Sequence, residues 1–297
     1  MPARIIDGKA LAQEYRRDIA GRVALLKAQG GRARLDAVLV GTADDASHLY
    51  AHNQGKTCAE LGIEYRLHEI STGEGRPDTP QEVFDHVAGR VLLLNTQEEC
   101  AALMVHMPLP EGIDAYQVQR LIAPEKDVEG VNPANIGNIV YGRSSLAPCT
   151  GLATVKMIES TGIDVRGKLC VVVGASDVVG KPIAVMLMRR EATVISCNKH
   201  TPDLAALTRQ ADVLVAAVGK AGLITAGMVK PGAVVVDVGV NRVQGPDGTS
   251  RTAGDVEFAA VARVAGWLSP VPGGVGPMTV AMLLLNVVEA AEAARGR

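Results

Sequence analysis

A strand-turn-helix pattern over residues 168–180 constrains the fold more than any other stretch, and the sequence there is KLCVVVGASDVVG. The apolar run Leu169–Val173 ends at Gly174, and a helical pattern opens near Gly180. A buried parallel strand that leads through a glycine turn into a helix is typical of a nucleotide-binding βαβ fold. The turn and the helix N-terminus would direct backbone N–H groups toward a phosphate. Because the spacing is G-x-S-x-x-x-G and not G-x-G-x-x-G, a βα unit without a ligand is the alternative.

The alternation of apolar strands and amphipathic helices extends over most of the chain. In the C-terminal half, strands are predicted near 169–173, 192–196, 212–217 and 233–237, with helices between them. In the N-terminal half, strands are predicted over 35–40, 63–67 and 103–106, and helices over 8–30, 46–61 and 80–94. Asp44 or Asp45 is the expected N-cap of the helix over 46–61. This βαβ rhythm predicts two α/β units with mostly parallel sheets.

Other segments indicate how the chain divides between the two units. A linker helix is expected over 151–162, and Ser269–Thr279 is too rich in glycine and proline for regular structure. A long apolar helix over 280–294 would bury its surface by packing on the first unit. We therefore expect a first domain over 1–148, completed by the C-terminal helix 278–297, and a second domain over 149–277.

Composition and charge argue against several classes of protein. The net charge of −2 gives no electrostatic reason to bind nucleic acid or an anionic membrane, and one Trp, five Tyr and two Phe are few for base stacking. No signal peptide or membrane span is predicted. The five cysteines form no CxxC pair, and no His/Cys cluster has metal-ligand spacing. We expect reduced thiols, a cytoplasmic protein and no bound metal.

The expected helix over 46–61 carries several candidate side chains. Tyr50 and Gln54 are four residues apart, so they share a helix face, whereas His52 and Lys56 point elsewhere. If Tyr50 lines a cleft, Gln54 therefore lines it too. A half-buried core residue is the alternative interpretation of Tyr50.

Two further candidates follow a strand and a loop of the N-terminal half. His106 ends the strand over 103–106, where the carboxyl edge of a parallel sheet favours an acid–base role. A hydrogen-bonded structural histidine is the alternative. Glu129 lies in the charged loop 124–130, and because most loop carboxylates are solvated it indicates little alone.

The residues after the second strand of the C-terminal unit bear on the choice of dinucleotide. In NAD-specific folds an acid there bonds the ribose 2′-hydroxyl. This chain has Lys199 instead, and its first acid, Asp203, is an expected helix cap. A cation at that place favours a 2′-phosphate and hence NADP, with a solvated surface lysine as the alternative.

Six segments together resemble one family. They are HMPLP (106–110), PEKDVEG (124–130), PCT (148–150), GASDVVG (174–180), DVGVN (237–241) and PVPGGVGPMT (270–279). In this order and spacing they resemble the methylenetetrahydrofolate dehydrogenase/methenyltetrahydrofolate cyclohydrolase family, the bifunctional FolD proteins. The resemblance covers nearly the whole chain, and PVPGGVGPMT is highly specific to the family.

The resemblance implies a fold and a function. The fold would be two α/β domains with a cleft between them, the second a Rossmann-type dinucleotide-binding domain. Folate would bind the first domain and NADP the second. The dehydrogenase would pass a hydride from 5,10-methylenetetrahydrofolate to NADP, and the cyclohydrolase would hydrolyse the methenyl product to 10-formyltetrahydrofolate. A cytoplasmic homodimer in one-carbon metabolism and purine biosynthesis is also implied.

The resemblance also implies site residues, carried over by position. The expected catalytic residues are Tyr50, Gln54, His106 and Glu129. The expected substrate-binding residues are Tyr50, His106, Glu129, Pro272, Gly273 and Gly274. The expected cofactor-binding residues are Thr150, Gly174, Ala175, Ser176, Val179, Gly180, Lys199 and Val240. No metal is expected.

Three departures from the family pattern concern proton transfer and pterin binding. Gln54 stands where the family has the lysine of Tyr-x-x-x-Lys, and a neutral amide cannot replace it in proton transfer. His106 replaces a glutamine and Glu129 an aspartate, with the charge of the carboxylate kept. We expect hydride transfer to persist and the cyclohydrolase to be weak, lost or re-routed through His106.

Two more departures concern the cofactor. Ala175 replaces an arginine that contacts the 2′-phosphate, and Lys199, in place of a serine, would compensate. If it does not, NAD is the cofactor. The functional alternatives are a dehydrogenase for another pterin one-carbon carrier and a catalytically silent protein that binds folate or NADP.

Overall fold

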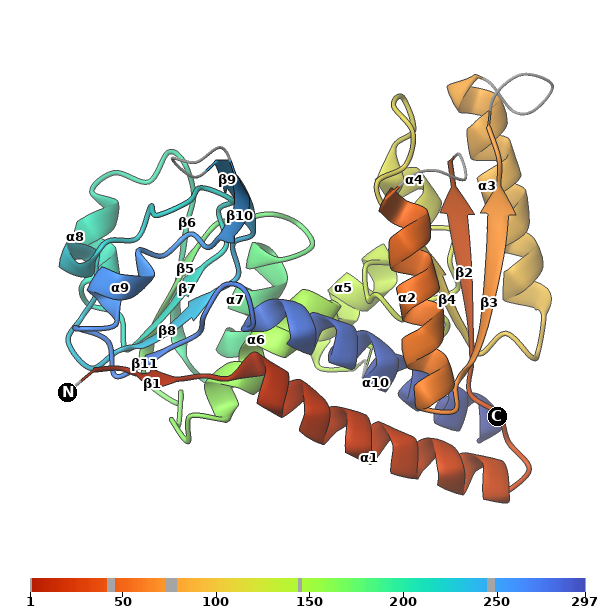
Figure 1. Ribbon diagram of the computed structural model, residues 1–297, viewed down its shortest axis with the longest axis horizontal. Coiled ribbons are helices and arrows are strands. Elements are labelled where there is room, and N and C mark those ends of the chain that lie inside the picture. The colour runs from red at the N-terminus through yellow and green to blue at the C-terminus, as the bar shows by residue number, and fades with distance from the viewer. Residues whose placement is uncertain (1, 42–45, 73–78, 144–145, 245–248, 297) are drawn as a thin grey trace. The chain divides into compact units, whose positions relative to one another are not determined.

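The computed structural model describes residues 2–41, 46–72, 79–143, 146–244 and 249–296 (Figure 1). The expected caps Asp44 and Asp45 lie outside these residues. The chain forms two compact units. Unit 1 comprises residues 1–14, 139–143 and 148–282, and unit 2 comprises residues 15–138, 144–147 and 283–297.

Unit 1 is built on a six-stranded sheet whose strands are all parallel, in the order β1-β11-β8-β7-β5-β6. The strands are β1 (Arg4–Ile5), β5 (Leu169–Val173), β6 (Thr193–Cys197), β7 (Val213–Ala216), β8 (Val234–Asp237) and β11 (Trp267–Leu268). The four predicted strands are present within a residue or two at each end. The sequence did not reveal β1 and β11, because two residues are too few for a periodic pattern.

Helices and a small hairpin complete unit 1. They are α6 (Cys149–Glu159), α7 (Gly180–Met188), α8 (Leu204–Thr208), the 3₁₀ helix η1 (Ala226–Met228), α9 (Phe258–Val261) and the antiparallel pair β9 (Asn241–Gln244) and β10 (Ser250–Ala253). The core includes the buried side chains of Val171, Leu214 and Val235, from three neighbouring strands. Burial of such runs on a parallel sheet explains why these strands are almost entirely apolar.

Unit 2 is built on a three-stranded parallel sheet in the order β3-β2-β4. Its strands are β2 (Arg34–Val40), β3 (Glu64–Ile70) and β4 (Ala102–Val105), and its helices include α2 (Ala46–Glu60), α3 (Pro80–Thr96) and α4 (Ala115–Gln119). Val38 and Val105 pack against the apolar face of α3, which starts at a capping box between Thr79 and Glu82.

Three helices contribute residues to both units: α1 (Gly8–Ala28), α5 (Pro133–Tyr141) and α10 (Val275–Arg295). The prediction that Ser269–Thr279 lacks regular structure is wrong at its end, because α10 already begins at Val275. Pro277 lies in the first helical turn, where its missing N–H removes no helical hydrogen bond. Among the described helices, α10 alone is long and apolar enough to cross a membrane, but most of it is buried inside the protein, as in a core helix.

Candidate functional site

The glycine turn between β5 and α7 has a backbone geometry that excludes side chains. Gly174 has a φ of +114°, and a Cβ there would lie 2.0 Å from the carbonyl oxygen of Ala217. A Cβ on Gly180 would lie 1.9 Å from the carbonyl oxygen of Gly174. Because backbone atoms fill this space, only glycine fits at either position. The turn leads directly into α7, whose first two N–H groups, those of Gly180 and Lys181, donate to the side-chain and backbone oxygens of Ser176.

A cavity of about 560 Å³ opens beside this turn. Its walls include Gly174, Ala175 and Ser176 after β5, Lys199, His200 and Thr201 after β6, and Val218 and Lys220 after β7. The carboxyl ends of three neighbouring parallel strands thus meet at one cavity, as expected for a ligand site in an α/β sheet. Two lysines and no acid are among the described residues that line it, so the cavity favours an anionic ligand.

The predicted cofactor residues divide into three groups. Gly174, Ala175, Ser176 and Lys199 line the cavity. Val179 and Gly180 continue the turn, and the Gly180 N–H donates to Ser176 Oγ at 3.4 Å. Thr150 and Val240 are not among the residues that line it; Thr150 lies on α6, and Val240 lines a different cavity.

Asp255 organises one wall of this cavity and was not predicted from the sequence. Its carboxylate accepts hydrogen bonds from the N–H groups of Val218, Gly219 and Lys220 at 2.6–2.9 Å, and from Asn241 Nδ2 at 2.9 Å. Such a set of donors fixes the loop that carries Lys220. The only sequence signal was an acid in the segment AGDVE, which does not identify a partner more than thirty residues earlier.

A second cavity of unit 1, of about 190 Å³, contains Val240 and the predicted substrate-binding residues of unit 1. It is lined by Pro272, Gly273 and Gly274 from the glycine-rich loop and by Asp237–Val240 after β8. Asp237 accepts N–H bonds from Gly239, Asp255 and Val256. Burial nevertheless raises the pKa of the Asp237 carboxyl to about 6. The glycine-rich loop is closely packed, since a Cβ on Gly8 would lie 1.9 Å from Gly274 O.

In unit 2, the structure brings Tyr50 and His106 together. Tyr50 on α2 is half exposed, and its ring meets the His106 ring edge-on, with 6.0 Å between the centroids and 87° between the planes. His106 follows β4 and is 4% exposed, and its backbone N–H donates to the backbone carbonyl oxygen of Val38 at 2.8 Å. The structure therefore places these two predicted residues in one cluster at the carboxyl end of the sheet.

Gln54 lies on the same helix but is buried, with 5% of its surface exposed. Its Nε2 contacts Met104 Sδ at 3.3 Å, and its Oε1 is buried with no hydrogen-bond partner among the described residues. A buried acceptor without a partner is energetically costly, and such groups often mark functional positions. The amide carries no charge, so it cannot supply the proton that a lysine would.

Burial and, to a smaller extent, the nearby His48 together lower the pKa of His106 to about 4. The imidazole is therefore neutral at pH 7. Its Nε2 lies 3.2 Å from the hydroxyl of Tyr65 on β3. Burial raises the pKa of that phenol, so it stays protonated. Tyr65 was not predicted, because a tyrosine in a half-exposed strand is an ordinary strand residue.

Glu129 differs from the expectation of a charged carboxylate. Burial and, to a smaller extent, the neighbouring Asp127 together raise its pKa to about 8. Its Oε2 is buried without a hydrogen-bond partner among the described residues. The Oδ2 of Asp127 accepts from the N–H of Asn132 at 2.7 Å and from Asn135 Nδ2 at 2.9 Å, while its Oδ1 is, like Glu129 Oε2, buried without a partner among the described residues. The raised pKa favours the protonated form of Glu129 in the ligand-free protein at pH 7, whereas its residue type alone predicts a charged carboxylate.

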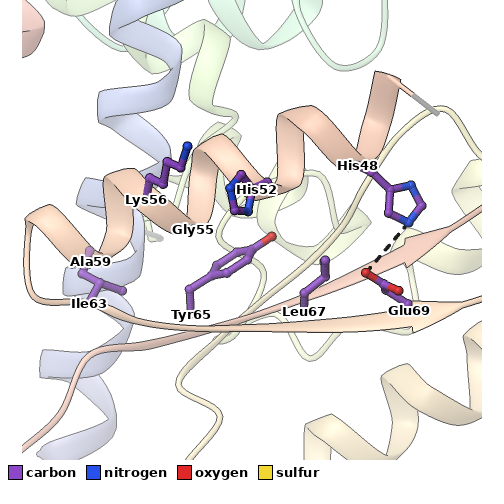
Figure 2. Close-up of a pocket in the computed structure, with 9 residues that line it drawn as sticks. All are labelled: His48, His52, Gly55, Lys56, Ala59, Ile63, Tyr65, Leu67 and Glu69. Carbon is purple, nitrogen blue, oxygen red and sulfur yellow. Dashed lines mark ion pairs between the residues drawn. The ribbon is translucent and has the colours of Figure 1, made fainter. Parts of the chain in front are cut away.

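A third cavity, of about 670 Å³, lies between α2 and β3 (Figure 2). His52 and Lys56 line it together with Tyr65, whereas Tyr50 and Gln54 do not. The expectation that His52 and Lys56 point away from the Tyr50 side of the helix agrees with this arrangement. His48 Nε2 lies 3.8 Å from Glu69 Oε1 in the same cavity. Over the described residues, no group of three or more His, Cys, Asp or Glu side chains could hold a metal ion.

Family models match both parts of the chain. Residues 6–129 match the tetrahydrofolate dehydrogenase/cyclohydrolase catalytic domain, and residues 148–295 match the NAD(P)-binding domain of the same family. A relative from Moorella thermoacetica, the bifunctional protein FolD, is 47% identical over 291 residues, which cover 98% of this chain and 99% of the relative.

Solved structures agree with these matches. A bifunctional FolD methylenetetrahydrofolate dehydrogenase/cyclohydrolase from Campylobacter jejuni is 36% identical with a TM-score of 0.90, covering 98% of this chain and 99% of that one. A Trypanosoma brucei FolD complexed with NADP and an inhibitor is 32% identical with a TM-score of 0.89, covering 100% of both chains. The resemblance seen in the six sequence segments is confirmed: the chain belongs to the tetrahydrofolate dehydrogenase/cyclohydrolase family.

Proposed function

We propose that this protein is an NADP-dependent methylenetetrahydrofolate dehydrogenase of one-carbon metabolism. The cavity beside the glycine turn carries the proposal, because the ends of three parallel strands meet there and two lysines with no acid line it among the described residues. The names of the relatives and the family models supply the substrate, since several relatives are dehydrogenases and cyclohydrolases of tetrahydrofolate derivatives. Unit 1 then binds the dinucleotide, and unit 2 binds the folate.

The residues of unit 1 fit an NADP molecule. Gly174 and Gly180 permit the close backbone packing that shapes the turn beside the cavity, and Ser176 adds a hydroxyl to the cavity wall. Lys199 and Lys220 provide the positive charge for a 2′-phosphate, in the place of the arginine that Ala175 lacks. When bound, the nicotinamide accepts the hydride, and the protein contributes binding and orientation.

The residues of unit 2 fit a pterin ring. Tyr50 and His106 offer an aromatic edge and face at one place. Glu129, protonated at pH 7, offers one O–H donor and one carbonyl acceptor, and a ligand rich in donors would draw it toward the ionised form. Pro272, Gly273 and Gly274, which line the second cavity of unit 1, stay predicted substrate-binding residues.

The cyclohydrolase step is proposed to be weak or absent. Addition of water to a methenyl cation needs a group that exchanges a proton near neutral pH. Gln54 cannot do so, and the neutral His106 holds Tyr65 at its Nε2. Re-routing of the proton through His106 is therefore disfavoured.

Three other features are proposed with this function. The folate domain is unit 2, which includes the C-terminal residues 283–297. A homodimer fits the outer edge of β3 in the sheet of unit 2, which no strand of the described residues covers, since open edges of sheets are common pairing surfaces. A cytoplasmic location fits the five cysteines, which are all buried and form no disulfide.

A paired assay tests the proposal. The purified protein receives 5,10-methylenetetrahydrofolate with NADP and, separately, with NAD, and reduced cofactor and methenyl product are followed independently. We expect faster reduction of NADP and a methenyl product that accumulates. Absence of reduction with both cofactors would overturn the proposal and favour another pterin carrier or a binding protein.

A further inference from the structure

We propose that Tyr65 is a positioning residue, which holds His106 in the tautomer that carries its proton on Nδ1. The inference starts from the 3.2 Å contact between the Tyr65 hydroxyl and His106 Nε2, which joins residues 41 positions apart in the sequence. What the tautomer implies for substrate binding rests on the proposed function, whereas the assignment of the tautomer does not depend on that function.

The surroundings of His106 leave its ring little freedom. Its backbone N–H is bonded to Val38 O, its side chain is almost completely buried, and the Tyr50 ring packs edge-on against it. The Tyr65 hydroxyl therefore meets Nε2 in a fixed position. An imidazole held in this way keeps the tautomer that its hydrogen-bond partner selects.

The phenol is the donor in this contact. A phenol O–H is a good donor and a poor acceptor, because its lone pair is delocalised into the ring, whereas the unprotonated nitrogen of a neutral imidazole is a strong acceptor. Both groups are uncharged at pH 7, since burial raises the pKa of Tyr65 and lowers that of His106. The proton of the imidazole then lies on Nδ1.

Helix α2 makes room for this arrangement at Gly55. A glycine within a helix is unfavourable, so a packing reason is expected for it. A Cβ on Gly55 would lie 2.9 Å from Cδ1 and 3.2 Å from Cε1 of Tyr65. Figure 2 shows the Tyr65 ring projecting from β3 toward α2 close to Gly55. The absence of a side chain at Gly55 therefore permits the ring position from which the hydroxyl reaches His106.

The tautomer decides what His106 can do. The described residues place no hydrogen-bond partner at Nδ1, so its N–H can donate to an uncharged acceptor such as a carbonyl oxygen or ring nitrogen of the substrate. A ring with its proton on Nδ1 and its Nε2 occupied cannot accept a proton from water. His106 is thus a donor that selects substrates by hydrogen bonding, and it is not a general base.

Nitrogen NMR on histidine-labelled, ligand-free protein tests the tautomer directly. The His106 signals are assigned by their absence in His106→Asn. We expect a protonated Nδ1 and an unprotonated, hydrogen-bonded Nε2 in the wild type, and a clear shift of both signals in Tyr65→Phe. Tyr116→Phe, which removes a half-exposed hydroxyl on α4, should change neither signal. A proton on Nε2 in the wild type, or unchanged signals in Tyr65→Phe, would overturn the proposal.

Gly55→Ala gives an independent result should Tyr65→Phe fold poorly. The added methyl group displaces the Tyr65 ring while the phenol is kept, so the His106 signals should move in Gly55→Ala as well. Signals identical to those of the wild type, in a variant with the wild-type circular dichroism spectrum, would contradict the packing argument.

Kinetics test the consequence for the reaction. In Tyr65→Phe we expect KM for methylenetetrahydrofolate to rise about fivefold, the loss of roughly one hydrogen bond, with kcat changed much less. His106→Asn, whose amide places a donor near the position of Nδ1, should keep a lower KM than His106→Leu. Equal KM values in these two variants would refute the donor role. A wild type without any turnover would refute the proposed function instead, and the NMR result would still decide the tautomer.

Discussion

The two candidate sites follow strands of parallel sheets, but different parts of the chain define them. At the end of β5 the backbone itself forms the site, because Gly174 and Gly180 approach other backbone atoms too closely for any side chain. At the end of β4 side chains form the site, through the contacts of His106 with Tyr50 and Tyr65. A site formed by the backbone keeps its geometry when neighbouring side chains are replaced, whereas a site formed by side chains changes its chemistry with each replacement.

The largest effect is expected where the backbone site is broken. In Gly180→Ala the new Cβ collides with Gly174 O, so the turn must open and NADP binding should fall by about a hundredfold or more. Isothermal titration with NADP measures this loss. Gly227→Ala is the matched control in unit 1, because no atom lies within 4 Å of the added methyl group. Unchanged affinity in Gly180→Ala would show that the turn does not hold the cofactor.

A smaller effect is expected from the replacement of a side chain that lines the cavity beside the glycine turn. Lys199→Ala removes the cation that we propose binds the 2′-phosphate, so NADP affinity should drop by about 10- to 100-fold while NAD affinity changes little. Titration of both dinucleotides gives the ratio. Lys156→Ala is the control, since that lysine pairs with Glu159 on the surface of α6. An equal loss for NADP and NAD would contradict the assignment of Lys199.

The raised pKa of Glu129 should make the stability of the protein depend on pH. The folded-state pKa of Glu129, about 8, lies above its ordinary value of 4.5, so the folded protein holds a proton that the unfolded chain has already released. The stability due to the protonated carboxyl is complete below about pH 4.5 and is lost as the pH rises through 8. At about 1.4 kcal/mol per pKa unit, the loss is on the order of a few kcal/mol.

Urea unfolding of the wild type and of Glu129→Gln between pH 4.5 and 8 measures this contribution. The wild type should lose more stability over that range than the variant, whose amide does not titrate. Asp237, with its own raised pKa of about 6, adds a slope of the same sign in both proteins and cancels in the difference. Parallel curves would show that Glu129 is ionised in the folded protein.

The difference between the two sites also explains what could be predicted from the sequence. The strand, turn and helix of the backbone site are contiguous, so Leu169–Val173, Gly174 and Gly180 revealed them without any knowledge of the fold. Tyr65 reaches His106 from another strand, and Asp255 binds a loop more than thirty residues away. Contacts between distant residues leave no local pattern, so neither was predicted.

The protonation state of Glu129 could not be predicted from the sequence either. Glu129 was expected to be charged from its residue type, but its pKa depends on burial and on Asp127, which only the folded chain defines. The start of α10 was missed for a different reason. The segment PVPGGVGPMT suggested an irregular loop, although a proline in the first turn of a helix such as Pro277 is tolerated. The glycine and proline content of the segment therefore did not predict where α10 begins, because the effect of a proline depends on its position in the helix.

The most direct test of the account measures methenyltetrahydrofolate hydrolysis and NADP reduction with one protein preparation, for the wild type, Gln54→Lys and the exposed control Asn53→Lys. We expect the wild type and Asn53→Lys to reduce NADP while the methenyl compound hydrolyses at its spontaneous rate, and Gln54→Lys to accelerate this hydrolysis. Hydrolysis by the wild type well above the spontaneous rate would contradict the loss of the cyclohydrolase, because a proton-transfer group would then act at the side-chain site without a lysine at position 54.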